Sequence, residues 1–430
     1  MAGARLISYL SGYILRYFLF KSSISENIEK RVEVSTPVSS WKRVTEGVHL
    51  YRQGVSPYSG DVFHESPLSL LLYEIVTRYI VDWVSLLFVL CDLLTAFFLG
   101  AAARKCGKNL AEKESNSSKF VAESSTILLQ DSDVGKVALI VETVYLLCPF
   151  SILACVGRST SVFTNLLLSL SFFCMVYGFS TITAVILALA TYQSFYPVML
   201  VVPTFISAFE NKKTTKERVY AALLILLIFV STLTSLLIIS FKVVGSWDFL
   251  WSTYGTIVSV PDLTPNVGLF WYFFTEMFDH FRIFFLWTFQ INAFIYMLPL
   301  SVRLRKEYTL LVIILLALTA VFKSYPSVAD TALYLSLLPL WKHLFPYMRQ
   351  TFIVGCIILS CTVLAPVLWF LWIYPGSANA NFYFGITLAY NTAQIFLITD
   401  LLFAYIKRDY ILHHGKKTEV DGKPVQLELR

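Results

Sequence analysis

Residues 218–240 read RVYAALLILLIFVSTLTSLLIIS, and after Arg218 this stretch contains no charged side chain. It is long enough to cross the roughly 30 Å hydrocarbon core of a bilayer as one α-helix, and much too long for a strand of a membrane barrel. Similar apolar runs recur along most of the chain, in which 57% of the 430 residues are hydrophobic and 14% are charged. A water-soluble protein of this size could not bury so many apolar side chains. The sequence therefore predicts an all-α, polytopic bundle of transmembrane helices.

Hydropathy predicts about twelve spans, and we treat residues 1–430 as a single multi-pass membrane domain. The fifth and sixth spans could form one helix from Thr181 to Phe209, but Tyr192 to Pro197 interrupts the pattern, and a single crossing would place the basic residues 212–218 on the wrong side. The first run is interpreted as a retained anchor because Arg16 interrupts it and no small-residue cleavage site follows. The predicted spans are 6–20, 84–103, 135–156, 160–178, 181–192, 195–208, 218–240, 283–301, 307–322, 328–345, 350–373 and 382–406.

The Lys and Arg residues between spans predict the orientation of the bundle. With twelve spans, the basic connections all fall on one face, which the positive-inside rule makes cytosolic, with both termini on it. The cytosolic segments include a flexible loop, 104–134, and a tail, 407–430. The lumenal segments include the loop 22–83, with an interfacial helix at Pro67–Ile80, and the loop 241–282, with an aromatic amphipathic helix.

Charge and cysteine usage exclude several kinds of site. The net charge is +6, but the basic residues form no stripe interleaved with aromatics, so no nucleic-acid partner is expected. Six of the seven cysteines lie in predicted spans and Cys106 lies in a basic loop, so no structural disulfide is expected. The sequon at Asn116 is predicted to be unused because it faces the cytosol. Asp92, Glu142 and Asp400 lie inside spans, where charge is costly, and are expected to hold helices together.

Two lumenal segments combine aromatic and polar side chains at the predicted membrane boundary. These are the aromatic segment 270–281 and the turn 374–384. Either could be ordinary structure, an interfacial anchor helix in the first case and a plain turn in the second. The functional interpretation is that the rings hold acyl chains while polar groups contact a lipid head group. The residues predicted to bind lipid are Tyr272, Phe274, Asp279 and His280 in the first segment and Ser377, Asn379, Asn381 and Tyr383 in the second.

The sequence predicts no catalytic residue, no metal site and no cofactor. The first lumenal loop has no Asp-x-Asp or Asp-Glu pair, and no Cys/His or Ser/His/Asp grouping is evident. His413 and His414 lack a third ligand nearby.

Several motifs, taken together, resemble the PIG-U family of GPI transamidase subunits. The resemblance runs from about residue 21 to His414 and leaves out the loop 104–134 and the tail after Gly415. The motifs that carry it are Val38–Arg43, Gly54–Gly60, Val62–Glu65, Leu187–Ser194, Ser259–Phe281, Phe322–Pro326, Gly376–Asn379 and Asn381–Phe384.

The resemblance implies a non-catalytic, lipid-binding subunit of a five-subunit complex in the endoplasmic reticulum membrane. A caspase-like cysteine protease subunit of that complex cleaves the substrate's C-terminal signal and joins the new carboxyl group to the GPI ethanolamine. The partners expected on this basis are the GPI lipid, membrane lipids, PIG-K (the protease), PIG-T, PIG-S and the Gaa-type subunit. The substrate's C-terminal signal is a second candidate ligand.

The family is also similar to GPI mannosyltransferases of the GT-C type, which implies a GT-C-like bundle. Their first loop holds an acidic pair, and residues 36–41 hold no acid here, so the departure counts against glycosyl transfer. An active mannosyltransferase would need Glu33, Glu46, Asp61 or Glu65 to replace those acids. A GPI lipid transporter or scramblase is the other alternative, suggested by the intramembrane charges and the break near Tyr192.

Overall fold

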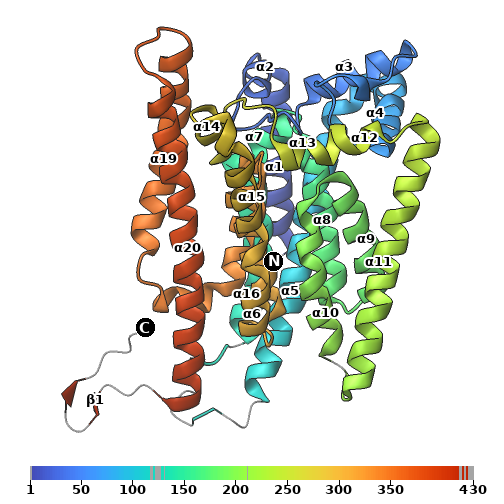
Figure 1. The fold of residues 1–430 in the computed structure, drawn as a ribbon. Coiled ribbons are helices and arrows are strands. Elements are labelled where there is room, and N and C mark those ends of the chain that lie inside the picture. The colour runs from blue at the N-terminus through green and yellow to red at the C-terminus, as the bar shows by residue number, and fades with distance from the viewer. Residues whose placement is uncertain are drawn as a thin grey trace.

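A computed structural model describes residues 2–116, 120–121, 127–129, 131–210, 212–415, 419–420 and 423–424. The long helices lie side by side along one axis, and several short helices gather at one end of the bundle (Figure 1). The two strands, β1 (Glu419–Val420) and β2 (Lys423–Pro424), are two residues each and pair antiparallel. The described chain is therefore almost entirely helical, as the sequence predicts.

The helices follow the predicted spans, each span matching one helix or two consecutive ones. The N-terminal half contains α1 (Ala2–Lys21), α2 (Ile24–Glu29), α3 (Trp41–Arg52), η1 (Pro57–Ser59), α4 (Pro67–Tyr79), η2 (Val81–Trp83), α5 (Val84–Ser115), α6 (Asp131–Leu147), α7 (Pro149–Val156), α8 (Ser161–Val176), α9 (Ser180–Gln193), η4 (Tyr196–Leu200) and α10 (Val201–Phe209). The C-terminal half contains α11 (Thr215–Val244), α12 (Asp248–Leu250), η5 (Trp251–Gly255), α13 (Thr256–Ser259), α14 (Phe270–Thr275), α15 (Asp279–Ile295), α16 (Met297–Arg303), α17 (Tyr308–Phe322), α18 (Val328–Leu337), η6 (Leu338–Tyr347), α19 (Thr351–Ile373) and α20 (Ala380–His414).

Among the described residues, five helical segments are long and apolar enough to cross a membrane: α5 with η2, α11, α15 with α16, α19 and α20. The bent pair α6 and α7 makes a sixth if it counts as one span. Helices α8, α9 and α17, and η4 together with α10, are apolar but shorter. The chain is a multi-pass, helical membrane protein.

The bend between α6 and α7, which measures 50°, has a local cause. Pro149 has no N–H to donate and disfavours helical backbone at the residue before it, and Cys148 is extended (φ −63°, ψ 124°). The carbonyl that the break frees at Leu146 accepts a 2.7 Å hydrogen bond from Nη1 of Arg16 in α1. Arg16 also donates to Ser151 Oγ in α7 (3.1 Å), so one side chain bridges both halves of the bend.

Arg16 is completely buried and forms an ion pair with Asp92 of α5, with Nε 2.7 Å from Oδ2. The Tyr145 hydroxyl of α6 donates to the other carboxylate oxygen at 2.7 Å. Both charges are therefore compensated where water is excluded. The expectation that Asp92 holds helices together is confirmed.

The other two intramembrane acids also join elements. Glu142 of α6 receives two 2.7 Å hydrogen bonds from Arg5 of α1. Asp400 of α20 accepts from the backbone N–H groups of Arg349 and Gln350 at the start of α19. It thereby satisfies donors that a helix N-terminus leaves free.

Residues 22–83 and 245–278 form a cap at one end of the bundle, drawn with α2, α3, α4, α12, α13 and α14 in Figure 1. The predicted helix at Pro67–Ile80 is present as α4. The predicted single aromatic helix over 270–281 is wrong, because α14 ends at Thr275 and α15 begins at Asp279. Between them Phe278 is extended (φ −67°, ψ 137°), so the chain turns from the cap into a long helix.

Two other connections can be compared with their predictions. The break near Tyr192 is confirmed: α9 ends at Gln193, Ser194 is extended, and the 3₁₀ turn η4 follows. The predicted flexible loop 104–134 is shorter than expected, since α5 continues to Ser115 and α6 begins at Asp131. Within that loop the sequon residues Ser117 and Ser118 lie outside the described residues, as does most of the tail after Gly415.

Replacing Asp92 with leucine should destabilise the protein strongly, because it leaves the Arg16 guanidinium buried without a counter-charge. The expected loss is about 3–5 kcal/mol, measured as a fall in the thermal unfolding midpoint in detergent. The double variant Arg16→Leu/Asp92→Leu should recover most of that loss. The exposed Asp82→Leu is the matched control. Equal effects of Asp92→Leu and Asp82→Leu would contradict the role assigned to the ion pair.

Candidate functional site

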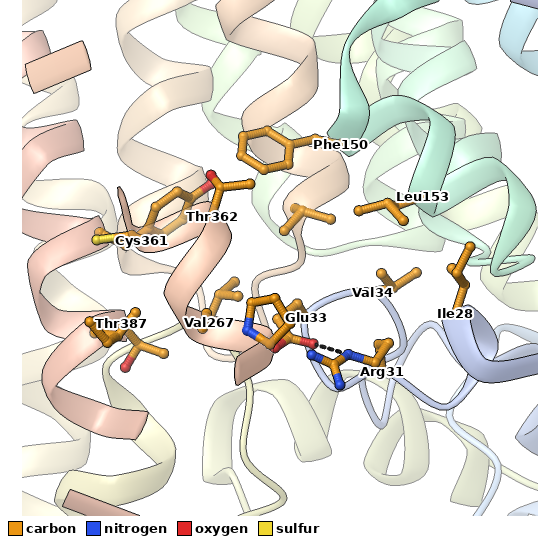
Figure 2. A pocket seen from close by; sticks show the side chains of 15 residues that line it. Ile28, Arg31, Glu33, Val34, Phe150, Leu153, Val267, Cys361, Thr362 and Thr387 are labelled. Carbon is orange, nitrogen blue, oxygen red and sulfur yellow. Dashed lines mark ion pairs between the residues drawn. The ribbon is translucent and has the colours of Figure 1, made fainter. Parts of the chain in front are cut away.

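A cavity of about 230 Å³ lies where the cap meets α7, α19 and α20 (Figure 2). Its wall is mostly apolar, and among the described residues the only charged side chains in it are Arg31 and Glu33, from the segment after α2. The lining residues are Ile28, Arg31, Glu33, Val34, Phe150, Leu153, Val267, Val328, Cys361, Thr362, Ala365, Pro366, Ile386, Thr387 and Tyr390.

Three features of the sequence build this wall. The bend after Cys148 lets α7 leave the line of α6 and supplies Phe150 and Leu153. Pro366 lies inside α19 and donates no hydrogen bond to the preceding turn, where Thr362 also lines the cavity. The segment before α14 is held by Asn391 of α20, whose Nδ2 donates to Val267 O at 2.7 Å.

Arg31 and Glu33 sit in a tight turn at the cap side of the cavity. The turn is fixed by Ser35 N donating to Arg31 O (2.9 Å) and Val328 N donating to Glu33 O (3.0 Å). Arg31 Nε lies 3.3 Å from Glu33 Oε2, and both side chains are largely buried. Among the described residues, Arg31 Nη2 and both Glu33 carboxylate oxygens make no hydrogen bond. A polar atom buried without a hydrogen-bond partner costs about 1–3 kcal/mol, which a suitable partner would recover.

An aromatic cluster continues the cavity wall on its α20 side. Trp271 of α14 lies 6.0 Å from the ring of Tyr383 and 5.9 Å from that of Phe384 (centroid distances), and Trp369 of α19 lies 5.2 Å from Tyr383. The cluster packs against Ala365 and Ile386, which also line the cavity. Trp271 Nε1 is buried without a hydrogen-bond partner among the described residues. Such a wall offers apolar contact with isolated donors, which suits an amphiphile.

The structure brings the two predicted lipid-binding segments together. The Tyr272 hydroxyl of α14 donates to Asn381 Oδ1 at the start of α20, and the Tyr272 ring stacks on Phe384 at 4.5 Å. Tyr383, also predicted, is fully buried in the aromatic cluster. Asn379 is the N-cap of α20: its Oδ1 accepts from the backbone N–H groups of Asn381 and Phe382. Its side chain therefore has a structural task of its own.

The other predicted residues lie apart from the cavity wall. Phe274 is buried and stacks on Phe270 at 5.8 Å, so it belongs to the cap interior rather than to a lipid-facing surface. Asp279 and His280 are exposed in the first turn of α15, where the His280 ring contacts Phe281 at 4.0 Å. Ser377 is exposed in the turn before α20.

The sequence carries little sign of the cavity itself. Arg31 lies in a polar loop, and Phe150 and Thr362 lie in apolar spans, and no motif distinguishes them from their neighbours. The available signals were weak: a proline after Cys148, a proline inside α19, and two opposite charges spaced two residues apart.

The chain is similar in sequence to proteins of one known family. A family model described as GPI transamidase subunit PIG-U matches residues 10–390. The GPI-anchor transamidase component PIGU of Homo sapiens is 41% identical over 439 aligned positions, which cover 100% of both chains. The protein of the same description from Mus musculus is 40% identical with the same coverage. The GPI transamidase component GAB1 of Saccharomyces cerevisiae is 30% identical over 391 positions, 90% of each chain.

The four acids that could replace the missing pair of a mannosyltransferase do not lie together in one site. Glu46 and Asp61 are exposed, and Glu33 pairs with Arg31. Glu65 is buried in the cap near the Thr160 hydroxyl, and burial raises the pKa of its carboxyl group to about 7, which the hydrogen bond with Thr160 opposes. The protonation state of Glu65 therefore changes near neutral pH.

The raised pKa of Glu65 predicts a pH-dependent stability difference for Glu65→Gln. Below pH 4.5 the carboxyl is protonated in folded and unfolded chains alike, so burial carries no ionisation cost. As pH rises from 4.5 to 7 the unfolded chain releases the proton while the folded protein keeps it, so wild type loses stability relative to the variant, by at most about 3 kcal/mol, and the difference levels off above pH 7. Thermal unfolding midpoints of both proteins between pH 5 and 8 measure this. A difference that stays constant over that range would contradict the prediction.

Proposed function

The chain belongs to the PIG-U family of GPI transamidase subunits, and we propose that it serves that complex by binding the lipid part of the GPI anchor in the cavity between α7, α19 and α20. Membership makes the protein a component of the machinery that attaches GPI anchors to proteins.

The observation that carries the proposal is an apolar cavity with one ion pair at its cap side. A GPI lipid has acyl chains joined through a phosphate to a glycan, and its two ends need opposite surroundings. The chains would pack against Phe150, Leu153 and Ile386, while the phosphate would draw on the free donor of Arg31. Glu33 would then face the hydroxyl groups of the head group.

The polar residues predicted from sequence fit around this core as glycan contacts. Tyr272 and Asn381 already touch each other beside the aromatic cluster, and both are accessible. We assign Ser377, Asp279 and His280 to the exposed rim that a glycan could reach. Asn379, Tyr383 and Phe274 would act by holding that rim in place, through the α20 cap and through packing.

We also propose a membrane topology and a set of partner subunits. We infer about twelve crossings in a GT-C-like bundle of the endoplasmic reticulum membrane, with both termini cytosolic and the cap lumenal, because the positively charged connections gather away from the cap. PIG-K, PIG-T, PIG-S and the Gaa-type subunit are the proposed partners, and PIG-K would carry out the peptide cleavage and transfer. The largely unburied helices α11 and α15 offer them apolar surface, which includes Leu227 and Trp287.

Filling the cavity should remove the lipid without removing the partners. In Thr362→Trp the indole would occupy the space between α19 and α20, whereas in Leu359→Trp, one turn earlier, it would face outward from a position that is 66% exposed. We expect at least a tenfold loss of GPI lipid that co-purifies with the complex for Thr362→Trp and none for Leu359→Trp, measured by mass spectrometry. Retention of the lipid in both variants would exclude this cavity as its site.

The Tyr272–Asn381 contact gives a separate prediction for the head group. Asn381→Ala and Tyr272→Phe each remove one polar group and leave the α20 cap intact, so the complex should assemble while co-purifying GPI falls about five- to twentyfold, corresponding to about 1–2 kcal/mol. Asn379→Ser keeps a capping oxygen and should bind lipid like wild type. A greater loss in Asn379→Ser than in Asn381→Ala would show that Asn379 itself contacts the ligand.

A further inference from the structure

A second pocket, separate from the lipid cavity, lies beneath the cap. Its volume is about 70 Å³, and its wall comes from the start of α8, the end of α9, η5, the end of α17 and cap residues 38–39 and 64–65. Fifteen of its 21 lining residues carry polar side chains. Polar groups inside a membrane bundle are costly unless they serve a structure or a ligand.

The hydroxyl groups in this wall are mostly acceptors. Thr253 donates its proton to Phe249 O (2.6 Å), and Tyr254 donates to Tyr192 O (2.6 Å). Two more hydroxyls do the same: those of Thr319 and Tyr325 donate to Leu315 O (2.8 Å) and Asp262 O (2.9 Å). Each hydroxyl keeps a lone pair that can accept, and none of the four has a proton left to give. A complementary ligand must therefore bring several donors.

The wall is balanced in charge. Lys323 and Asp330 form an ion pair on one side, with Nζ 2.6 Å from Oδ1. Glu65 on the other side has no cation within ion-pair distance among the described residues, and its pKa of about 7 allows it to be protonated. The pocket therefore suits a neutral ligand better than a fixed ion.

We propose that this pocket binds a single neutral, hydroxyl-rich ring, such as a sugar or a cyclitol. At about 10–15 Å³ for each water, the pocket holds about five to seven waters. The acceptors come from different elements, so they face a ring from several directions. Glu65 and Gln193, whose Oε1 already accepts from Thr164 (3.2 Å), add polar contacts at the edge.

The proposal does not depend on the lipid assignment, although the two sites are neighbours. The segment from Val34 to Ser39 separates them, with Val34 lining the lipid cavity and Ser39 lining the polar pocket. The ring could belong to the glycan of the anchor or be a free polyol. A variant of the pocket would lose co-purifying GPI lipid in the first case and keep it in the second.

The test uses the purified complex in detergent, titrated with mannose, with myo-inositol and with ethanolamine as a smaller, cationic donor. The variant is Thr319→Val, which has the same shape and removes one acceptor. Its control is Thr288→Val on the exposed side of α15, where the hydroxyl makes the same bond to the carbonyl four residues earlier (Phe284 O, 3.0 Å). We expect one of the two polyols to raise the unfolding midpoint saturably, and Thr319→Val to weaken that binding about tenfold while Thr288→Val does not.

Three results would overturn the proposal: no saturable shift with either polyol, a shift with ethanolamine alone, or equal weakening by Thr319→Val and Thr288→Val. If polyol binding is lost in Thr319→Val, co-purifying GPI lipid identifies the source. A matching fall in GPI places an anchor ring in the pocket, and unchanged GPI assigns a free polyol to it. Thr362→Trp, which blocks the lipid cavity, should leave polyol binding intact, so failure of one site can be told from failure of the other.

Discussion

The ion pair between Arg16 and Asp92 is the interaction on which the rest of the bundle depends. Lipid cannot hydrate the charges or the carbonyl groups of a broken helix, so both must be satisfied within the protein. Arg16 does both tasks at once: it pairs with Asp92 on α5 and donates to Leu146 O and Ser151 Oγ on either side of the bend between α6 and α7. That bend is what supplies Phe150 and Leu153 to the lipid cavity. A single buried guanidinium therefore connects the packing of the bundle with the shape of the site.

The two pockets beneath the cap illustrate how different chemistry can be built on the two sides of one segment. The lipid cavity is mostly apolar, and among the described residues its charged side chains are those of Arg31 and Glu33, so it suits a molecule with an apolar end and a charged end. The second pocket includes four hydroxyl groups that have given their protons to backbone carbonyls, and so it suits a molecule rich in donors. A transamidase component that holds both parts of an anchor would need both environments close together.

The sequence predicts the helices well because their signal is local. Long apolar runs fix their positions, and breakers such as the stretch at Tyr192–Pro197 fix where they end. The contact between Tyr272 and Asn381 joins the two segments that were predicted to bind lipid. Both predictions rest on the same pattern, aromatic and polar side chains at a membrane boundary. The lipid cavity has no such signal, because its wall combines segments far apart in the chain.

The central claim is that the cavity between α7, α19 and α20 holds the lipid of the anchor. Photo-crosslinking tests it most directly, with a diazirine amino acid placed at position 153 in the cavity wall and, in a separate sample, at the exposed position 359. The account predicts a GPI adduct at position 153 and bulk phospholipid adducts at position 359 when the complex is taken from membranes. Bulk phospholipid alone at both positions would contradict it.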